Sequence, residues 1–220
     1  MAHDDLLAQT EFFADASPEE VLSLAKTATE RMLVRGDVLF GEGETADALF
    51  VVLTGRVAMA IANPIDNRES MVGLMTPGDL FGEMPMLDHG PRSASARALE
   101  PSSVLAIPYS AVITLFNENP SLLWGVTRLL AGRLRETNEA LADSVFLDVT
   151  GRTAKRLLEL ADGRDSFLLP VTQEELAGMV GASRERVNKA IASFIRLGFL
   201  EQHDRRYTIK IRERLEQRAR

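Results

Sequence analysis

The 220-residue chain contains no cysteine. A disulfide framework, a thiolate zinc site and a cysteine-held iron–sulfur cluster are therefore excluded, and the absence fits a reducing compartment. No apolar run approaches the ~20 residues that a membrane-spanning helix needs. Residues 1–13 carry acids and lack the basic start of a signal peptide, so we expect a cytoplasmic protein with no membrane partner.

Basic residues are scarce in the first two thirds of the chain. The net charge is −7 overall, which argues against nucleic acid as a partner of the whole chain. Residues 148–220 contain 15 Lys and Arg against 11 Asp and Glu, a net charge of +4, whereas residues 1–147 contain 10 against 21, a net charge of −11. This asymmetry indicates that only the last part meets phosphate. Chance scatter of surface charge is an equally good explanation.

Hydrophobic periodicity divides the first 118 residues into two kinds of structure. Ser17 and Pro18 fit an N-cap and a first helical position, and they predict an amphipathic helix over residues 18–30. From Met32 to Tyr109, short apolar runs alternate with glycine and proline, which indicates a β sandwich or a barrel-like roll. No G-x-G-x-x-G sequence follows a strand, so a Rossmann domain is excluded.

Residues 120–146 return to a helical period. Apolar and small polar residues recur there at alternating steps of four and three, which makes a heptad seam. The strongly charged flanks of the seam favour self-association into a homodimer over packing of the helix on its own domain. The two polar seam residues fix the register of the pair or contact something else. The seam consists of Leu123, Thr127, Leu130, Leu134, Thr137, Leu141 and Ser144.

The last part of the chain has the pattern of a winged helix-turn-helix. Asp148 can cap a helix over residues 150–162. A capping-box pattern at Thr172 starts a helix that ends at Gly181, and a second helix follows at once. Two short strands about the basic turn 204–206 make a wing. A helix-turn-helix also occurs as a purely structural hairpin, but the wing and the local basic excess favour DNA binding.

The start of the second helix carries side chains suited to reading DNA. In this motif class the helix enters the major groove with its first residues at the base edges. Arg184 can donate two hydrogen bonds to guanine, Glu185 can accept one from cytosine, and Lys189 can reach guanine or phosphate. Helix N-termini can add phosphate contacts. The alternative is a solvated charged face. The predicted DNA-contacting residues are Thr172, Gln173, Ser183, Arg184, Glu185, Lys189 and Arg205.

A second cluster of functional residues lies in the β-rich region. Gly82 permits close approach of a ligand to the backbone, and Glu83 can accept a hydrogen bond from a sugar hydroxyl. Arg92 with Ser93 can hold a phosphate. The same residues could instead form an ordinary Glu–Arg ion pair inside a turn.

Together these motifs resemble the CRP/FNR family of bacterial regulators over nearly the whole chain, and within it the cyclic AMP receptor protein branch. Residues 183–190 are most similar to actinobacterial members. The resemblance implies an α+β protein with an N-terminal cyclic-nucleotide-binding, jelly-roll-like β-roll (1–118), a dimerisation helix with hinge (119–147) and a winged helix-turn-helix DNA-binding domain (148–220). It is carried by Gly43-Glu44, Leu53-Thr54-Gly55, Pro77-Gly78-Asp79, the phosphate-binding cassette 81–93, the hinge 146–152 and the reader 180–185.

The resemblance also implies a ligand and partners. Cyclic AMP would be an allosteric ligand, with Glu83 at the ribose hydroxyl and the cyclic phosphate on Arg92 and Ser93. Pro85 departs from the family pattern, and a shift of the cassette geometry at this position is left open. DNA would carry a TGTGA-like palindrome, and RNA polymerase would be a further partner. The full set of ligand-binding residues implied is Gly82, Glu83, Met84, Arg92, Ser93, Arg133, Thr137 and Asn138.

Other functions remain open to different degrees. A regulator of the same fold could sense cyclic GMP or cyclic di-GMP, or bind DNA without a ligand. A haem sensor would depend on His3, His89 or His203, and His89 fits a solvated loop better. A scaffold without DNA binding is disfavoured by the charged reading helix. The sequence shows neither a nucleophile–base pair nor a metal-ligand cluster, so we expect no enzymatic activity.

Overall fold

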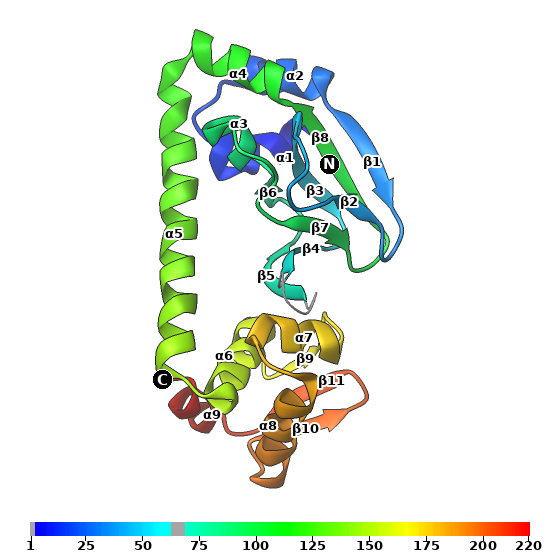
Figure 1. The fold of residues 1–220 in the computed structure, drawn as a ribbon, viewed down its shortest axis with the longest axis vertical. Coiled ribbons are helices and arrows are strands. Elements are labelled where there is room, and N and C mark those ends of the chain that lie inside the picture. Colours follow the sequence, from blue (N-terminus) through cyan, green and yellow to red (C-terminus); the bar gives the residue numbers. More distant parts are fainter. Residues whose placement is uncertain (1–2, 63–68) are drawn as a thin grey trace. The chain divides into compact units, whose positions relative to one another are not determined.

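The computed structural model describes residues 3–62 and 69–220. The chain forms two compact units, Met1–Arg135 and Glu136–Arg220, and helix α5 (Leu123–Phe146) contributes to both. Both units combine helices with antiparallel sheets, which confirms the α+β class (Figure 1). Among the described helices, none has the length and apolar character needed to cross a bilayer. The three-part division at residues 118 and 147 stays a prediction.

The first unit contains two four-stranded antiparallel sheets, with strand orders β1-β8-β3-β6 and β2-β7-β4-β5. The predicted β-rich region is confirmed, although its first strand begins three residues before Met32. The strands are β1 (Thr29–Leu33), β2 (Val38–Phe40), β3 (Ala48–Thr54), β4 (Val57–Ala62), β5 (Glu69–Met75), β6 (Leu80–Phe81), β7 (Ser95–Ala98) and β8 (Ser102–Pro108).

Strand β3 is buried on both of its faces. Phe50 and Val52 join a core cluster with residues of both sheets, in which the Phe50 ring stacks on Phe81 with centroids 5.5 Å apart. Leu49 and Val51, which point the other way, join a second cluster with residues of the helices. A strand covered on both sides needs apolar residues at every position, so β3 reads as a continuous apolar run without alternation.

Helices cover the second cluster. Figure 1 shows α2 and α4 together beside the sheet that contains β3 and β8. Ser17 caps α2, as the sequence predicts, and it also forms a complete capping box with Glu20. Helix α2 ends at Thr27 and not at residue 30, because Thr29 already pairs with β8. The helices of this unit are α1 (His3–Gln9), η1 (Glu11–Phe13), α2 (Pro18–Thr27), α3 (Met84–Asp88), α4 (Tyr109–Glu118), η2 (Pro120–Leu122) and the first part of α5.

Gly55, in the turn between β3 and β4, gives a stability prediction. Its φ is +77°, and a Cβ there would lie 2.6 Å from the carbonyl oxygen of Pro101. Gly55→Ala is therefore expected to lower the free energy of unfolding by roughly 1–3 kcal/mol. Gly132→Ala on α5 is the control: its Cβ would meet nothing within 4 Å, and it should gain about 0.5–1 kcal/mol. Urea unfolding curves with coincident midpoints for the two variants would contradict this account.

The second unit is a winged helix-turn-helix, as predicted. Its three-stranded sheet has the order β10-β11-β9. Strand β9 comes from the apolar run at residues 167–171. The sequence does not predict α9, because a helix of seven residues with one buried side chain, Leu215, shows no clear hydrophobic period. The elements are α6 (Val149–Ala161), β9 (Ser166–Leu168), α7 (Gln173–Val180), α8 (Arg184–Arg196), β10 (Leu200–His203), β11 (Arg206–Ile209) and α9 (Arg212–Arg218).

Local signals fix the ends of the two helices of the motif. The backbone N–H of Glu175 donates to the Thr172 hydroxyl at 3.2 Å, and the Thr172 N–H donates to the Glu175 carboxylate at 2.6 Å. Gly181, at φ +66°, ends α7, and Ser183 caps α8. The capping box and both helix boundaries are therefore confirmed. The α8 face that packs inward is buried throughout and consists of Val187, Ala190, Ile191 and Phe194.

Candidate functional site

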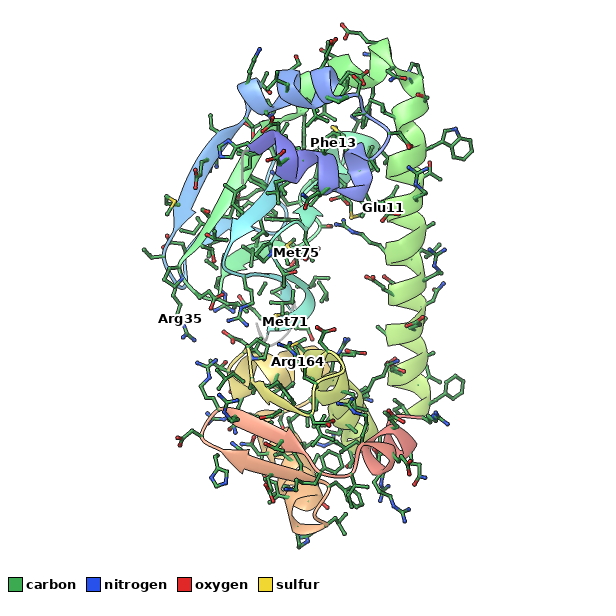
Figure 2. All side chains as sticks on the ribbon, turned by 180° about the vertical axis from the view of Figure 1, so that it is seen from behind. Glu11, Phe13, Arg35, Met71, Met75 and Arg164 are labelled. Carbon is green, nitrogen blue, oxygen red and sulfur yellow. The ribbon has the colours of Figure 1, made fainter. Side chains whose placement is uncertain are left out.

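A small cavity of about 70 Å³ lies in the first unit beside the cassette 81–93. It brings together six of the eight predicted ligand-binding residues. Met75 of β5, which Figure 2 labels, also contributes to the lining. The complete lining is Phe40, Met59, Met75, Phe81, Gly82, Glu83, Met84, Pro85, Arg92, Ser93, Ala94 and Arg133.

The backbone of the cassette depends on Gly82. Its φ is +78°, and a Cβ there would lie 2.6 Å from Nη1 of Arg92, so only glycine leaves room for the arginine. Helix α3 then starts at Met84 with Pro85 in its first turn, where a missing N–H leaves no helical hydrogen bond unmade. The helix accommodates Pro85 and gives no reason for a shift of the cassette.

Arg92 is buried, with 4% of its surface exposed. Nη1 donates to the Gly82 carbonyl at 2.8 Å and to the Tyr109 hydroxyl at 3.1 Å, while Nη2 donates to the Ala48 carbonyl at 2.8 Å. The guanidinium carbon lies 4.0 Å from the centroid of the Phe40 ring. Burial lowers the pKa of Arg92 and raises the pKa of Tyr109. Within the described residues, the buried Nε of Arg92 has no acceptor, so this donor remains for an anion.

Glu83 is 1% exposed and pairs with Nη1 of Arg133, a residue of α5. The other arm of Arg133 donates to the Leu80 carbonyl. The structure therefore does not contain the Glu83–Arg92 pair that the sequence left open, because Arg133 meets the carboxylate. A buried carboxylate needs such a compensating charge. A ligand hydroxyl at Glu83 has to share this carboxylate with Arg133 or displace it.

The remaining predicted ligand residues are exposed. The Ser93 hydroxyl lies in the cavity lining, 3.5 Å from the sulfur of Met84. Thr137 and Asn138 lie on the part of α5 that belongs to the second unit, and their contact with the ligand stays a prediction. His89 is an exposed C-cap of α3 at φ 59°, as a solvated loop residue should be. In the described part of the chain no group of side chains could hold a metal ion.

The predicted reading residues lie on the exposed start of α8. Arg184, Glu185 and Lys189 are all exposed. The Lys189 ammonium lies 2.7 Å from the Glu185 carboxylate, and its hydrogen bond lowers the pKa of Glu185. The two side chains are about three-quarters exposed, at 75% and 76%. This surface pair carries little stability and can be exchanged for contacts to base edges.

A hollow of about 260 Å³ in the second unit gathers four predicted DNA-contacting residues, two from the start of α7 and one each from α8 and the wing. Arg205 also donates to the Leu169 carbonyl at 3.0 Å, so it connects the wing to the segment before α7. Sequence reasoning missed Gln202 and Tyr207, whose only signal is their position beside the wing turn. The lining is Leu169, Val171, Thr172, Gln173, Arg184, Gln202, Asp204, Arg205 and Tyr207.

Residues at the start of α6 hold the hinge that follows α5. Asp148 caps α6 by accepting from the Gly151 N–H at 2.7 Å, as predicted. Arg152 donates from Nη1 to the Leu147 carbonyl at 2.8 Å and from Nε to the Val180 carbonyl at 2.9 Å. One side chain thus connects the end of α5 to the end of α7, within the second unit.

A β-roll with a small cavity that contains Glu83 and Arg92, together with a winged helix-turn-helix, defines a DNA-binding regulator with a sensor domain. Residues 30–119 match the family model of the cyclic nucleotide-binding domain, and residues 151–218 match that of the Crp-like helix-turn-helix domain. The CRP-like cAMP-activated global transcriptional regulator of Mycobacterium tuberculosis is 37% identical over 224 residues, which cover 99% of this chain and 100% of the relative. The chain therefore belongs to the CRP/FNR family of transcriptional regulators.

Solved structures agree with this membership. The Thermus thermophilus catabolite activator protein matches with a TM-score of 0.55 and 31% identity, covering 96% of this chain and 98% of that one. The c-di-GMP-responsive global regulator CLP of Xanthomonas campestris matches with a TM-score of 0.76 and 24% identity, covering 88% and 99%. The second likeness shows the fold alone. The chain is thus a DNA-binding transcriptional regulator with a cyclic nucleotide-binding domain.

Proposed function

We propose that this regulator senses cyclic AMP and binds a palindromic DNA site as a homodimer. The observation that carries the ligand proposal is the cavity in which Glu83, Arg92 and Ser93 meet over the positive-φ Gly82. Glu83 can accept from a ribose hydroxyl, and the unpaired Nε of Arg92 with the Ser93 hydroxyl can donate to a cyclic phosphate. The names of the Mycobacterium and Thermus relatives, a cAMP-activated regulator and a cyclic AMP receptor protein, support cyclic AMP.

The size of the cavity gives the proposal a mechanism. At about 70 Å³ it is well below the roughly 300 Å³ of ordinary ligand sites, so the ligand needs a more open arrangement. Arg133 lines the cavity and holds Glu83, and it belongs to α5. Displacing it couples ligand binding to that helix. The ligand then shifts the populations of two states of the dimer. The hinge at Asp148 transmits this shift.

Another cyclic nucleotide is the alternative ligand. An arginine–phosphate site does not specify one nucleotide, and the Xanthomonas neighbour is described as c-di-GMP-responsive. Calorimetry with cyclic AMP, cyclic GMP and cyclic di-GMP separates these cases. Tightest binding of cyclic AMP supports the proposal. Binding of none of the three, together with unchanged DNA affinity, would point to a regulator that acts without a ligand.

Arg92→Leu is expected to weaken cyclic AMP binding about ten- to a hundredfold, because it removes a charge-assisted contact to the phosphate. The matched control is Arg97→Leu, which removes a partly exposed arginine paired with Glu69, outside the cavity. Calorimetry gives the affinities, and circular dichroism verifies that both variants fold. An Arg92→Leu protein with the affinity of the parent would remove Arg92 from the ligand site.

The homodimer proposal rests on α5. Its seam leucines are exposed in the single chain, by 45% at Leu123, 38% at Leu130, 61% at Leu134 and 62% at Leu141. Figure 2 shows side chains projecting along the whole length of this helix. An exposed apolar stripe of this length on a charged helix is suited to pairing with a second copy. A two-fold pair of reading helices then calls for a palindromic site. The family resemblance implies TGTGA-like half-sites, and RNA polymerase is the partner proposed for the bound dimer.

A further inference from the structure

Tyr207 of β11 has a hydroxyl that is buried within the second unit. The side chain is 1% exposed, and its ring stacks on Phe167 with centroids 5.9 Å apart. Among the residues that the structure describes, no group makes a hydrogen bond of acceptable geometry with the hydroxyl. Burial raises the pKa of Tyr207, and a smaller, opposite effect comes from an interaction with the Gln173 side chain that falls short of hydrogen-bond geometry. The hydroxyl therefore stays protonated and available as a donor.

Packing alone does not explain this tyrosine. The stacked ring would fit equally well as phenylalanine, and a buried hydroxyl without a partner costs stability. Such orphan groups in folded proteins call for an explanation, and one common explanation is a ligand that is absent from the free state. Tyr207 is one of the residues that line the 260 Å³ hollow, and a ligand bound in this hollow offers that explanation.

The other groups around the hollow suit an anion. Arg184 and Arg205 bring two guanidinium groups, and Gln202 brings a side-chain amide. Thr172 is the N-cap of α7, an eight-residue helix whose first turn carries the positive end of the helix dipole. Asp204 is the one carboxylate in the lining, so the two arginines leave a net positive charge. This combination of two guanidinium groups, a hydroxyl and a helix N-terminus fits phosphate better than other anions.

We propose that the hollow seats one phosphate of the DNA backbone, with the Tyr207 hydroxyl as a neutral donor to it. The proposal rests on the proposed function, because it assumes that α8 reads the major groove. Arg184 then lies both at the base edges and in the wall of the hollow. A backbone phosphate close to the bases that Arg184 reads comes within reach of the same hollow. Binding opens the lining enough to expose the hydroxyl and gives it an acceptor.

Tyr207→Phe tests this in the full-length protein with a palindromic duplex. Affinity is expected to fall about tenfold for matched and single-base-altered sites alike. The salt dependence should not change, because the hydroxyl carries no charge. The midpoint of thermal unfolding should stay the same or rise, because the orphan hydroxyl is gone. If Tyr207 has a merely structural role, the substitution should instead lower the DNA affinity and the unfolding midpoint together. That outcome would overturn the proposal.

Thr208→Val is the matched control. It removes a hydroxyl from the next position of the same strand, 3.5 Å from the Ser166 hydroxyl and outside the lining of the hollow, so DNA affinity should stay at the parent value. Equal affinities of the parent and Tyr207→Phe would also overturn the proposal. A parent that does not bind duplex DNA at all would instead refute the proposed function.

A duplex series with one neutral methylphosphonate at a time locates the phosphate. At the position facing the hollow, the methylphosphonate should lower the DNA affinity of the parent protein. It should lower the affinity of Tyr207→Phe by little beyond the loss that this variant already shows, because the hydroxyl and the charged oxygen belong to one contact. Additive losses at every position would mean that the hydroxyl meets no backbone phosphate, and would refute the proposal.

Discussion

Arg184→Ala is expected to lower the affinity for a TGTGA-like palindrome by about 1–3 kcal/mol per half-site, hence by roughly 2–6 kcal/mol for the dimer. The reason is the loss of two hydrogen bonds to one guanine in each half-site. Preference at that base pair should relax at the same time. Arg184 is exposed at the first position of α8, so its truncation should leave the fold intact.

Arg205→Ala is the comparison variant for this prediction. If Arg205 meets phosphate, its removal weakens binding to all sequences alike and reduces the slope of log affinity against log salt by about 0.9 per phosphate lost. Because Arg205 also donates a hydrogen bond to the Leu169 carbonyl, the stability of the variant has to be measured together with its DNA affinity. The assay is binding of a matched and a single-base-altered duplex at two salt concentrations. Equal losses of Arg184→Ala on both duplexes, with specificity intact, would rule out Arg184 as a base-reading residue.

Leu134→Asp is expected to convert the protein to a monomer and to abolish tight binding to the palindrome. Leu134 is 61% exposed in the single chain, so an aspartate is tolerated there until a second copy covers it. In a closed seam the two carboxylates would be buried near each other without a countercharge. Sedimentation equilibrium measures the change of mass.

Ala142→Asp is the control for the dimer. It makes the same change of charge at an exposed position of α5 that lies outside the seam, and it should leave the dimer intact. Dissociation by both variants would mean that charge on the helix, and not the seam, controls association. An unmutated protein that sediments as a monomer at micromolar concentration would refute the dimer.

The elements that the sequence predicts well are those fixed by contacts within a few residues. Ser17, Thr172 and Ser183 accept hydrogen bonds from backbone groups three residues on, and Gly181 ends a helix through its own φ. Such rules need no knowledge of the tertiary fold. The sequence pattern predicts the end of α2 three residues too late, because strand pairing with β8, about 75 residues away, overrides helical periodicity.

The sequence predicts that the cassette residues gather in one place, but it does not predict the contacts that each of them makes. The cassette pattern identifies Gly82, Glu83, Arg92 and Ser93, and all four meet at the cavity. The pairing of Glu83 with Arg133 joins residues 50 apart, which neither spacing nor composition can specify. The inward hydrogen bonds of Arg92 depend in the same way on the Ala48 carbonyl, 44 residues earlier.

The pair between Glu83 and Arg133 has a consequence for the concentration at which the regulator responds. Arg133 pairs with the Glu83 carboxylate. In the proposed mechanism this pair marks the closed form, and Arg133 then acts as an internal competitor of the ligand. The apparent dissociation constant equals the intrinsic one divided by the fraction of molecules in the open form. A change at residue 133 that loosens this pair by about 1.4 kcal/mol moves the response threshold nearly tenfold, provided the closed form predominates. The signalling range can therefore be retuned from α5, with the residues proposed to hold the phosphate left untouched.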